Sequence, residues 1–598
     1  MQVDVIIDHV LEAPHGNWEG LSYGELALVY IAYVVMNCSH HLSPVEAGVA
    51  QHLTSLSQAL GKPVRVQDCT DDRLAFLLSR LGGEQTHPGE QIELELGQHL
   101  IRAYKLPTET VRIDMTSVSV YRQSQDNQGL MRFGHSKDHR PDLRQFKAVL
   151  GTLDPVGLPL AIAVLSGEQA DDPHYTPAWD RLAATIGHSD FLAVGDCKLA
   201  SLDNRAHIHQ RKGFYLTPLP MTGNIPSEMR ALVLNPLNSA QEIRLRGQNA
   251  HEAPVGQGFE VVATCTWQPP DDTEETIIWN ERRLVVQSEA HACRQRVGLQ
   301  ERLAKAEAAL AALNIRPAID QAELESRAQT ILKRYDLTDH LSLTFPEQVT
   351  HQTNYIGRGR PGPDRPTQIS EAHTWTVEVH RQIEAIDLFN RLAGWRIYVT
   401  NTTVSRLSLT DAVNCYRQEW QPEHGFHRLK GGLLAIMPLY LRDDERIRGL
   451  LLLLGIALRV LTLTEFVARR DLASTGENLK GLYAGNPNRA TDQPTAERLL
   501  KAFGNITLYR YETGDQIQYE VTPLSPLQRR ILKALGVPKS IYDPPIAPII
   551  NGGRKKNNRK MRLTGLIKLL YRCYNFNAIG TFEKQIKANL PQLMGYCS

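Results

Sequence analysis

The first hundred residues carry the apolar spacing that amphipathic helices require. Four leucines follow Asp71-Asp72 at intervals of three and four residues: Leu74, Leu77, Leu78 and Leu81. The sequences Ser22-x-x-Glu25 and Ser43-Pro44-x-Glu46 have the spacing of capping boxes and predict two further helix starts. We therefore expect residues 1–105 to form a helical domain, which either binds DNA like a helix-turn-helix or serves packing and dimerisation.

Beyond residue 105 the pattern changes to short β-branched and apolar runs. The run Val111–Tyr121 is bounded by polar sequence and predicts a strand that carries Asp114. Strands are also expected at 146–153, 158–166 and 213–219, with a helix near 176–186. The apolar run that begins at Phe191 predicts a short strand that ends on Asp196.

A long interval follows, because 227 residues separate Asp196 from Glu423. Runs at 261–267 and 276–286 predict strands within it. Apolar residues spaced by four and three then predict an amphipathic helix: Leu299, Leu303, Ala306, Leu310 and Leu313. Residues 394–400 predict one more strand, and Ser408-x-x-Asp411 predicts the capped start of a helix. We expect a buried helix over 443–463 and a mixed helical and hairpin region over 490–540.

Composition narrows the class of protein. Hydrophobic residues make up 42% of the 598-residue chain, which is enough for real cores and excludes a disordered protein. The acidic N-terminus argues against a signal peptide, and the most apolar run, 449–458, is shorter than the roughly 20 residues that span a bilayer. The eight cysteines form no Cys-x-x-Cys pair, so neither a zinc site nor a disulfide framework is expected, and a reducing cytoplasm fits.

The net charge of +1 does not by itself indicate a nucleic-acid partner, but the charge is unevenly distributed. Residues 551–598 hold ten lysines and arginines against one acid, Glu583, which leaves 56 basic and 64 acidic residues in 1–550. Any contact between the body of the protein and DNA must then come from local clusters. The basic tail is either a DNA-binding arm or a disordered solubilising segment.

Three residues near position 420 follow one another at intervals of seven: Tyr416, Glu423 and Lys430. Because seven residues are just under two helical turns, one helix would present a hydroxyl, a carboxylate and an ammonium on the same face. That set suits a metal ion and a phosphate, and a solvated face is the alternative. Asp114 and Asp196 belong to predicted buried strands, where an acid is costly unless it is paired or binds a metal. Each aspartate alone also fits a turn or a helix cap.

The order of these motifs resembles the DDE transposases of bacterial insertion sequences, in the group with a Tyr-Arg-Glu-Lys signature. Tyr416, Glu423 and Lys430 fall on that signature, and the resemblance covers roughly residues 20–510. Residues 134–143 also resemble a stretch that is typical of this group.

Two positions depart from the family pattern. The Arg position of the signature holds Glu419, and Pro422 would remove a helix hydrogen bond just before the Glu. The missing cation would have to come from Arg417 or Arg428, neither of which is at the family's position. Trp420 matches the place where relatives carry a Trp near a flipped base.

The resemblance implies a mixed α/β fold, in which a β-rich insertion domain interrupts an RNase H-like catalytic core between a helical N-terminal domain and a mainly helical C-terminal region. The three strands followed by alternating helix and strand match the start of that core. The expected segments are 1–105 for the helical domain, 106–222 and 371–470 for the two parts of the core, 223–370 for the insertion, 471–550 for the C-terminal region and 551–598 for the basic tail.

By the same resemblance, Asp114, Asp196 and Glu423 are the expected catalytic residues and the ligands of two Mg²⁺ ions, for which Mn²⁺ is a possible substitute. Tyr416 and Lys430 would hold a 5′ phosphate or the flanking backbone, with Trp420 beside them. Five cations are candidates for DNA contact: Arg417, Lys137, Arg140, Arg358 and Arg360. The last two belong to Gly-Arg-Gly-Arg-Pro, which resembles minor-groove hooks, although a surface turn is the alternative. For Lys137 and Arg140 the alternative is ordinary surface charge.

The function that these resemblances imply is a transposase that cuts and joins DNA at the ends of an insertion sequence. Its partners would be double-stranded DNA, both terminal inverted repeats and target, and a second copy of the chain in the DNA complex. We expect a bacterial, cytoplasmic, nucleoid-associated protein with no membrane partner, and excision through a DNA hairpin. The alternatives are an RNase H-like endonuclease without strand transfer, or a retired transposase that only binds DNA.

Overall fold

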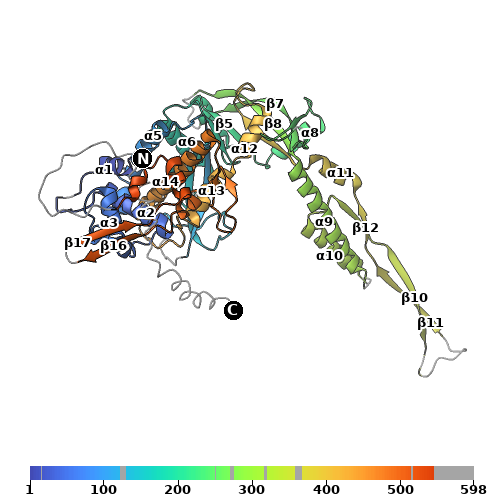
Figure 1. The fold of residues 1–598 in the computed structure, drawn as a ribbon. Helices are drawn as coiled ribbons and strands as arrows, with labels where there is room; N and C mark the ends of the chain where they lie inside the picture. Colours follow the sequence, from blue (N-terminus) through green and yellow to red (C-terminus); the bar gives the residue numbers. More distant parts are fainter. Residues whose placement is uncertain are drawn as a thin grey trace. The chain divides into compact units, whose positions relative to one another are not determined.

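A computed structural model describes residues 1–14, 16–121, 129–249, 251–269, 275–315, 320–356, 358, 367–513 and 516–544. These residues have a mixed α/β fold, as the sequence predicts, and belong to two compact units (Figure 1). The first unit comprises residues 1–216 together with the chain from 416 onward, and the second comprises residues 217–415. Arg360 and the basic tail 551–598 lie outside the described residues.

The first unit begins with five helices: α1 (Val3–Val10), α2 (Tyr23–Asn37), α3 (Val45–Leu60), α4 (Asp71–Leu81) and α5 (Pro88–Tyr104). The predicted capping box at α2 is formed, because Ser22 Oγ accepts from the Glu25 N–H at 3.2 Å and Glu25 accepts from the Ser22 N–H at 2.8 Å. The predicted box at Ser43 is not formed; α3 begins behind Pro44 without a side-chain cap. The four leucines of α4 are buried, as their spacing predicts.

The sheet of the first unit contains the strands that the sequence predicts: β1 (Thr110–Val120), β2 (Arg144–Leu153), β3 (Leu158–Ser166), β4 (Leu192–Gly195) and β5 (Phe214–Pro218). Their order is β3-β2-β1-β4-β5. The pairs β1–β2 and β2–β3 are antiparallel, whereas β1–β4 and β4–β5 are parallel. Helices α6 (Tyr175–Ile186) and α7 (Leu202–Gln210) connect β3 to β4 and β4 to β5.

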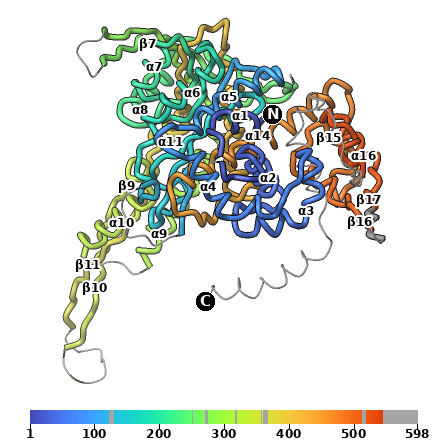
Figure 2. Tube along the Cα trace, turned by 90° about the vertical axis from the view of Figure 1, so that its left-hand side faces the viewer, coloured from blue at the N-terminus to red at the C-terminus, as the bar shows by residue number. Residues whose placement is uncertain are grey.

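The chain returns to the first unit through the end of α12 (Leu409–Tyr416) and continues into α13 (Trp420–Lys430) and α14 (Asp444–Thr475). The predicted buried helix is therefore α14, which is longer than the expected 443–463. Within the described residues α14 is the one helix long and apolar enough to cross a membrane by length and composition, and 89% of its most apolar window is buried inside the protein. It contacts α2 and α4 of the N-terminal helices, strand β3, and α13, α15 (Ala496–Lys501) and α16 (Pro526–Ala534), as a core helix would, and Figure 2 shows it next to the N-terminal helices.

The rest of the first unit is the mixed helical and hairpin region that the sequence predicts. It contains β14 (Leu479–Lys480), β15 (Ala490–Thr491), α15 (Ala496–Lys501), β16 (Leu508–Thr513), β17 (Gln516–Val521) and α16 (Pro526–Ala534). Strands β16 and β17 form the hairpin.

The second unit contains an antiparallel group of strands and a helical layer. The strands are β6 (Gln241–Ile243), β7 (Gly256–Trp267), β8 (Ile277–Ser288) and β13 (Trp395–Thr400), in the order β13-β8-β7-β6. The helices are α8 (Ile225–Leu234), α9 (Glu289–Leu313), α10 (Gln321–Tyr335) and α11 (Ile383–Leu392). The predicted amphipathic helix is α9, which buries Leu299, Leu303, Ala306 and Leu310 in a core shared with α10 and α11.

Beyond this helical core the second unit carries a two-stranded antiparallel ribbon. It consists of β10 (Glu347–Tyr355) and β11 (Thr367–Trp375). Strand β9 (Leu341–Thr344) precedes the ribbon and β12 (Glu378–Arg381) follows it, and these two short strands pair with each other. Both views show β10 and β11 extending away from α9 and α10 (Figures 1 and 2). We refer to β10 and β11 as the ribbon.

Candidate active site

Asp114 lies in the middle of β1, directly opposite Leu150 of β2. Its side chain is only 19% exposed. The Met115 N–H donates to Asp114 Oδ1 at 2.7 Å, which fixes one oxygen close to the backbone. The Lys137 ammonium stands 3.8 Å from the same oxygen.

Asp196 is brought to Asp114 by the parallel pairing of β1 and β4. Because Ile113 pairs with Gly195, the residues that follow on each strand, Asp114 and Asp196, emerge side by side. The hydroxyl of Tyr175, a fully buried residue at the start of α6, donates to Asp196 Oδ1 at 2.6 Å. The Lys198 N–H donates to the same oxygen at 2.9 Å. Sequence analysis did not identify Tyr175, since nothing in its local pattern marks it as a partner of Asp196.

Tyr416 and Lys430 do not belong to one continuous helix; the helix restarts near Pro422, where the sequence already indicates a kink or a restart. Helix α12 ends at Tyr416 and α13 begins at Trp420, so Tyr416 does not share a helix with Glu423 and Lys430. Pro422 gives the physical reason, since in a continuous helix its ring would clash with the carbonyl of Gln418. In the first turn of a new helix its missing N–H costs nothing.

Glu423 occupies the first turn of α13 and is exposed. Helix α13 contacts β1 and β2 and buries Phe426 and Leu429 beneath it. Gly425 permits this close approach, because a Cβ there would lie 3.0 Å from a methyl carbon of Leu150, the residue paired with Asp114. The helix thus carries Glu423 toward the strand that holds Asp114.

The electrostatics show that the charges of Asp196 and Glu423 both reach Asp114. Burial raises the pKa of Asp114 to about 6; the Lys137 ammonium and the Met115 hydrogen bond oppose this rise, and the charges of Asp196 and Glu423 add to it. A carboxylate that is buried beside two other acids is stabilised when a cation joins it.

Glu419, the residue in the signature's Arg position, belongs to the same group of acids. Burial raises the pKa of Glu419 to about 7; a hydrogen bond with Tyr416 opposes the rise, and the charges of Asp114 and Asp196 add to it. The departure from the family pattern therefore places a fourth carboxyl group near the two aspartates.

The donor set suits a hard divalent cation, because Mg²⁺ and Mn²⁺ prefer carboxylate oxygens. Among the described residues, however, no group of three or more His, Cys, Asp or Glu side chains is arranged closely enough to hold an ion. The carboxyl groups of Asp114, Asp196 and Glu423 thus influence one another without forming a closed ligand cage. Lys137 supplies the positive charge beside Asp114.

The segment 134–143 makes ion pairs at two points of the site. Lys137 Nζ donates to the Met115 carbonyl at 2.5 Å and lies 3.6 Å from Asp171 and 3.8 Å from Asp114. The next residue, Asp138, accepts from Lys430 Nζ at 2.9 Å. Two of the cations expected to contact DNA therefore face carboxylates of the protein.

The other candidate DNA-binding residues differ in their surroundings. Trp420 is 57% exposed and meets the His424 ring edge-on with 6.4 Å between ring centroids, so it is not a core residue. Arg417 and Arg358 are exposed. Arg140 forms an ion pair with Asp142 at 2.6 Å.

Arg428 does not supply the cation missing from the signature. It is buried, and its guanidinium pairs with Glu465 of α14 and with Glu497 of α15. This pairing ties α13 to the helices behind it, so the role of Arg428 is structural.

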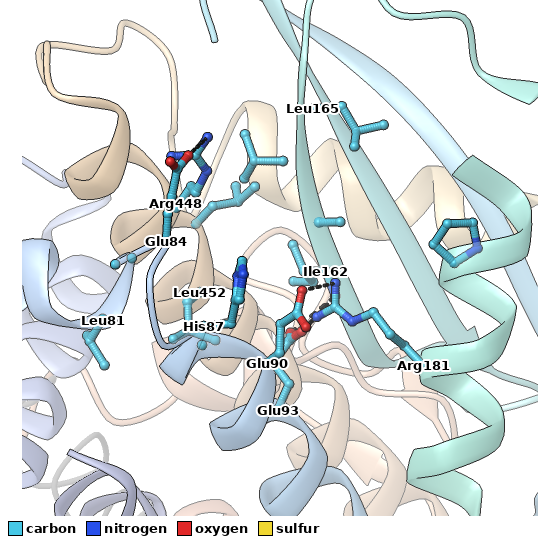
Figure 3. A pocket seen from close by; sticks show the side chains of 17 residues that line it. Leu81, Glu84, His87, Glu90, Glu93, Ile162, Leu165, Arg181, Arg448 and Leu452 are labelled. Carbon is cyan, nitrogen blue, oxygen red and sulfur yellow. Dashed lines mark hydrogen bonds and ion pairs between the residues drawn. The ribbon is translucent and has the colours of Figure 1, made fainter. Parts of the chain in front are cut away.

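A separate cavity of about 610 Å³ lies in the first unit (Figure 3). It is lined by β3, the start of α5, and residues of α6 and α14, and none of Asp114, Asp196 and Glu423 borders it. On its floor Glu93 pairs with Arg181 and, at 2.9 Å, with the buried Arg459 of α14. Glu93 also accepts from the Ile162 N–H at 3.1 Å. The cluster therefore provides a hydrogen-bond acceptor for a backbone N–H on the outer edge of β3.

One of three comparisons with known proteins identifies a family for this chain. The family model described as a transposase DDE domain matches residues 106–460, which is more than half of the chain. No curated protein shows a significant match. Among solved structures, the piggyBac transposase synaptic complex with hairpin DNA is similar to the chain at 10% identity and a TM-score of 0.30, covering 79% of this chain and 73% of that one. A likeness that weak carries no argument about this protein.

Proposed function

Because this chain belongs to the family of transposase DDE domains, we propose that it cuts DNA at the ends of a bacterial insertion sequence and joins those ends to a target. The observation that supports this proposal is that the charges of Asp196, which follows β4, and of Glu423 in α13 both act on the buried Asp114 of β1. The strand order β3-β2-β1-β4-β5 also supports an RNase H-like core. The insertion-sequence context, a bacterial cytoplasm and a DNA-bound homodimer are part of the same proposal.

Asp114, Asp196 and Glu423 would hold two Mg²⁺ ions, with Mn²⁺ as a substitute. Bound ions of this kind lower the pKa of an attacking oxygen and stabilise the charge on the phosphate during an in-line displacement. Within the chain, the Tyr175 hydroxyl and the Lys198 N–H both donate to one oxygen of Asp196 and so fix the orientation of its carboxylate. No side chain is required as a covalent nucleophile.

The residues around the acids would position the DNA. Lys430 and Tyr416 would bind a 5′ phosphate or the adjacent backbone, which requires Lys430 to exchange Asp138 for a phosphate. Trp420, exposed at the start of α13, would stack on a base that leaves the helix during hairpin formation. Such a stacking platform contributes roughly 1–3 kcal/mol for each base.

A cleavage assay tests the proposal. The substrate is labelled duplex DNA from both sides of the gene, where the terminal repeats of its element would lie, incubated with the purified full chain and Mg²⁺ or Mn²⁺. Strand transfer into a plasmid supports the proposal. Cleavage without transfer indicates an endonuclease, and binding without cleavage indicates a retired transposase; either result contradicts the proposal.

A hairpin assay tests the position of Trp420. If Trp420 is a base platform, Trp420→Ala should still nick the first strand while the yield of DNA hairpin falls, and Trp420→Phe should restore part of that yield. A folded Trp420→Ala protein with an unchanged hairpin yield would remove Trp420 from the site.

A further inference from the structure

Strand β10 of the ribbon is exposed throughout, and β11 is exposed except for Ser370, Ala372, Thr374 and Trp375, which are half-buried. The pairs run from Glu347–Trp375 to Tyr355–Thr367 without a bulge, and every residue of β10 is exposed. A two-stranded ribbon buries too little surface to be more than marginally stable in water by itself. An arm of this kind is therefore expected to act by lying against a partner.

The two faces of the ribbon differ in chemistry. Because side chains alternate along a strand, one face collects the even-numbered residues, and we call it the amide face: Gln348, Thr350, Gln352, Asn354, Gln368, Ser370, Ala372 and Thr374. The hydrogen bond from Asn354 Nδ2 to Ser370 Oγ, at 3.0 Å, confirms that these positions share a side. The amide face carries no ionisable side chain.

The opposite face holds all the ionisable side chains of the ribbon. His373 contacts Glu347 at 2.6 Å, and His351 lies 3.6 Å from Glu371. Both glutamates thus point away from the amide face. Apolar residues, among them Ile369, share this second face.

The hydroxyl groups of the amide face are turned toward the ribbon itself. Thr350 donates to the Ala372 carbonyl and Thr374 to the Gln348 carbonyl, both at 3.3 Å, and Ser370 donates to the Gln352 carbonyl at 3.4 Å. The groups that extend outward are therefore the carboxamides of the glutamines and the oxygen of Asn354. Each glutamine amide offers two donors and one acceptor.

We propose that the amide face docks in the major groove of duplex DNA and contacts base edges there; this inference rests on the proposed function. The major groove is about 12 Å wide and admits a two-stranded β-ribbon. Nine residues for each strand, at about 3.3 Å per residue, span roughly 30 Å, close to one helical turn of DNA. Gln and Asn pair in bidentate fashion with adenine, and the methyl groups of Ala and Thr contact the thymine methyl.

The charge distribution favours DNA over a protein partner. Carboxylates are repelled by phosphates, and the amide face has none, whereas the second face carries two. The one purely apolar side chain on the amide face is Ala372, too little for a hydrophobic interface core. Arg358, exposed just beyond Tyr355, adds a positive charge at the far end of the ribbon, where a phosphate contact would fit.

The test compares two neighbouring substitutions on opposite faces. Gln352→Glu places a carboxylate on the amide face, and Thr353→Glu places one on the second face at the same depth of the ribbon. Binding of the full chain to labelled duplex from the flanking DNA is measured by fluorescence anisotropy. Gln352→Glu should weaken binding about 5- to 100-fold, which corresponds to the loss of one bidentate contact with a base. Thr353→Glu should change the affinity less than about twofold. Hydroxyl-radical footprints should lose about one helical turn of protection only with Gln352→Glu.

Several outcomes would overturn the inference. One is equal binding of DNA by both variants. Another is a loss of binding only in Thr353→Glu, with a changed oligomeric state in light scattering, which would make the second face a contact between copies of the chain. A milder variant, Gln352→Ala, should weaken binding in the same direction and guards against misfolding. Failure of the proposed function looks different: the wild-type chain would then neither bind nor cleave the flanking DNA, whereas failure of this inference alone leaves metal-dependent cleavage intact.

Discussion

In the first unit four acidic side chains gather around β1, and burial raises the pKa of both Asp114 and Glu419. In the second unit the ribbon gathers neutral amides on one face, exposed along β10, and turns its two glutamates to the other side. The first arrangement costs stability, because carboxylates repel one another, and it attracts cations. The second arrangement costs little stability, and its neutral face does not repel the phosphates of DNA. Under the two proposals above, different parts of the chain react with phosphate and recognise DNA. The reacting part clusters carboxylates that bind cations, and the recognising face has no carboxylates.

The largest expected effect is the loss of cleavage in Glu423→Gln. Removing a metal ligand should lower the cleavage rate on the order of a thousandfold, since metal ions supply several kcal/mol of charge stabilisation, while binding to the flanking DNA stays within about threefold. The ribbon variant Gln352→Glu should show the reverse, with weakened binding but near-normal cleavage at saturating protein. Single-turnover cleavage and anisotropy on the same DNA measure the two effects.

Glu419→Gln is the matched control for Glu423→Gln, because both residues lie at the start of α13. If Glu419→Gln abolished cleavage and Glu423→Gln preserved it, the catalytic glutamate would be Glu419, and the position of the signature in this chain would have to be reassigned.

A smaller effect is expected from Tyr175→Phe. The substitution removes the hydrogen bond to Asp196 and leaves the ring packed, so the concentration of Mn²⁺ that gives half-maximal cleavage should rise about 10- to 100-fold. The maximal rate at saturating Mn²⁺ should change much less. The control Tyr440→Phe alters an exposed tyrosine outside the site and should shift neither quantity. A rise confined to the KM for DNA would contradict the positioning role.

The buried acid should be visible in stability. The pKa of Asp114, about 6 in the folded chain, lies above its ordinary value, so between about pH 4 and pH 6 the unfolded state ionises first and stability falls as the pH rises. In metal-free protein at pH 7, Asp114→Asn should therefore stabilise the fold by about 1–3 kcal/mol, and the gain should vanish near pH 4. Urea unfolding at both pH values measures it, and destabilisation at pH 7 would contradict the account.

The smallest effect is expected from Asp138→Asn. It releases Lys430 from an ion pair that is partly exposed, with 19% of the lysine and 35% of the aspartate side chain accessible. Such a pair contributes at most about 1 kcal/mol, so the melting temperature should barely move. Affinity for DNA should rise about two- to threefold if Lys430 exchanges Asp138 for a phosphate. An unchanged affinity would show that Lys430 does not reach DNA.

Much of the first unit could be predicted from its sequence, because the evidence is local. The β-branched run around Asp114, the apolar run before Asp196, the capping box of α2 and the leucines of α4 each depend on short-range spacing, and the structure contains all of them. The break between α12 and α13 could not be fixed in this way. Pro422 predicts that the helix is interrupted. Whether it kinks or restarts also depends on tertiary packing, such as that of Gly425 against Leu150, which is distant in the sequence.

The residues that hydrogen-bond to the site residues could not be predicted from the sequence either. Tyr175 meets Asp196, and Asp138 meets Lys430, across long stretches of chain, so no spacing rule links them. The ribbon is a further case: residues 347–355 are polar at nearly every position, so no alternation predicts a strand there, and the amide face appears only when the register with β11 is known.

The most direct test of the central claim replaces a proposed metal ligand with a softer one. Mg²⁺ binds thiolate poorly, whereas Mn²⁺ and other softer ions accept it more readily. Asp114→Cys, and separately Asp196→Cys, should abolish cleavage of the flanking DNA in Mg²⁺ and recover part of it in Mn²⁺, while Asp492→Cys, at an exposed aspartate outside the site, should behave like the wild-type chain in both metals. Near-normal cleavage by Asp114→Cys or Asp196→Cys in Mg²⁺ would show that these aspartates do not bind the catalytic ions, and would contradict the account.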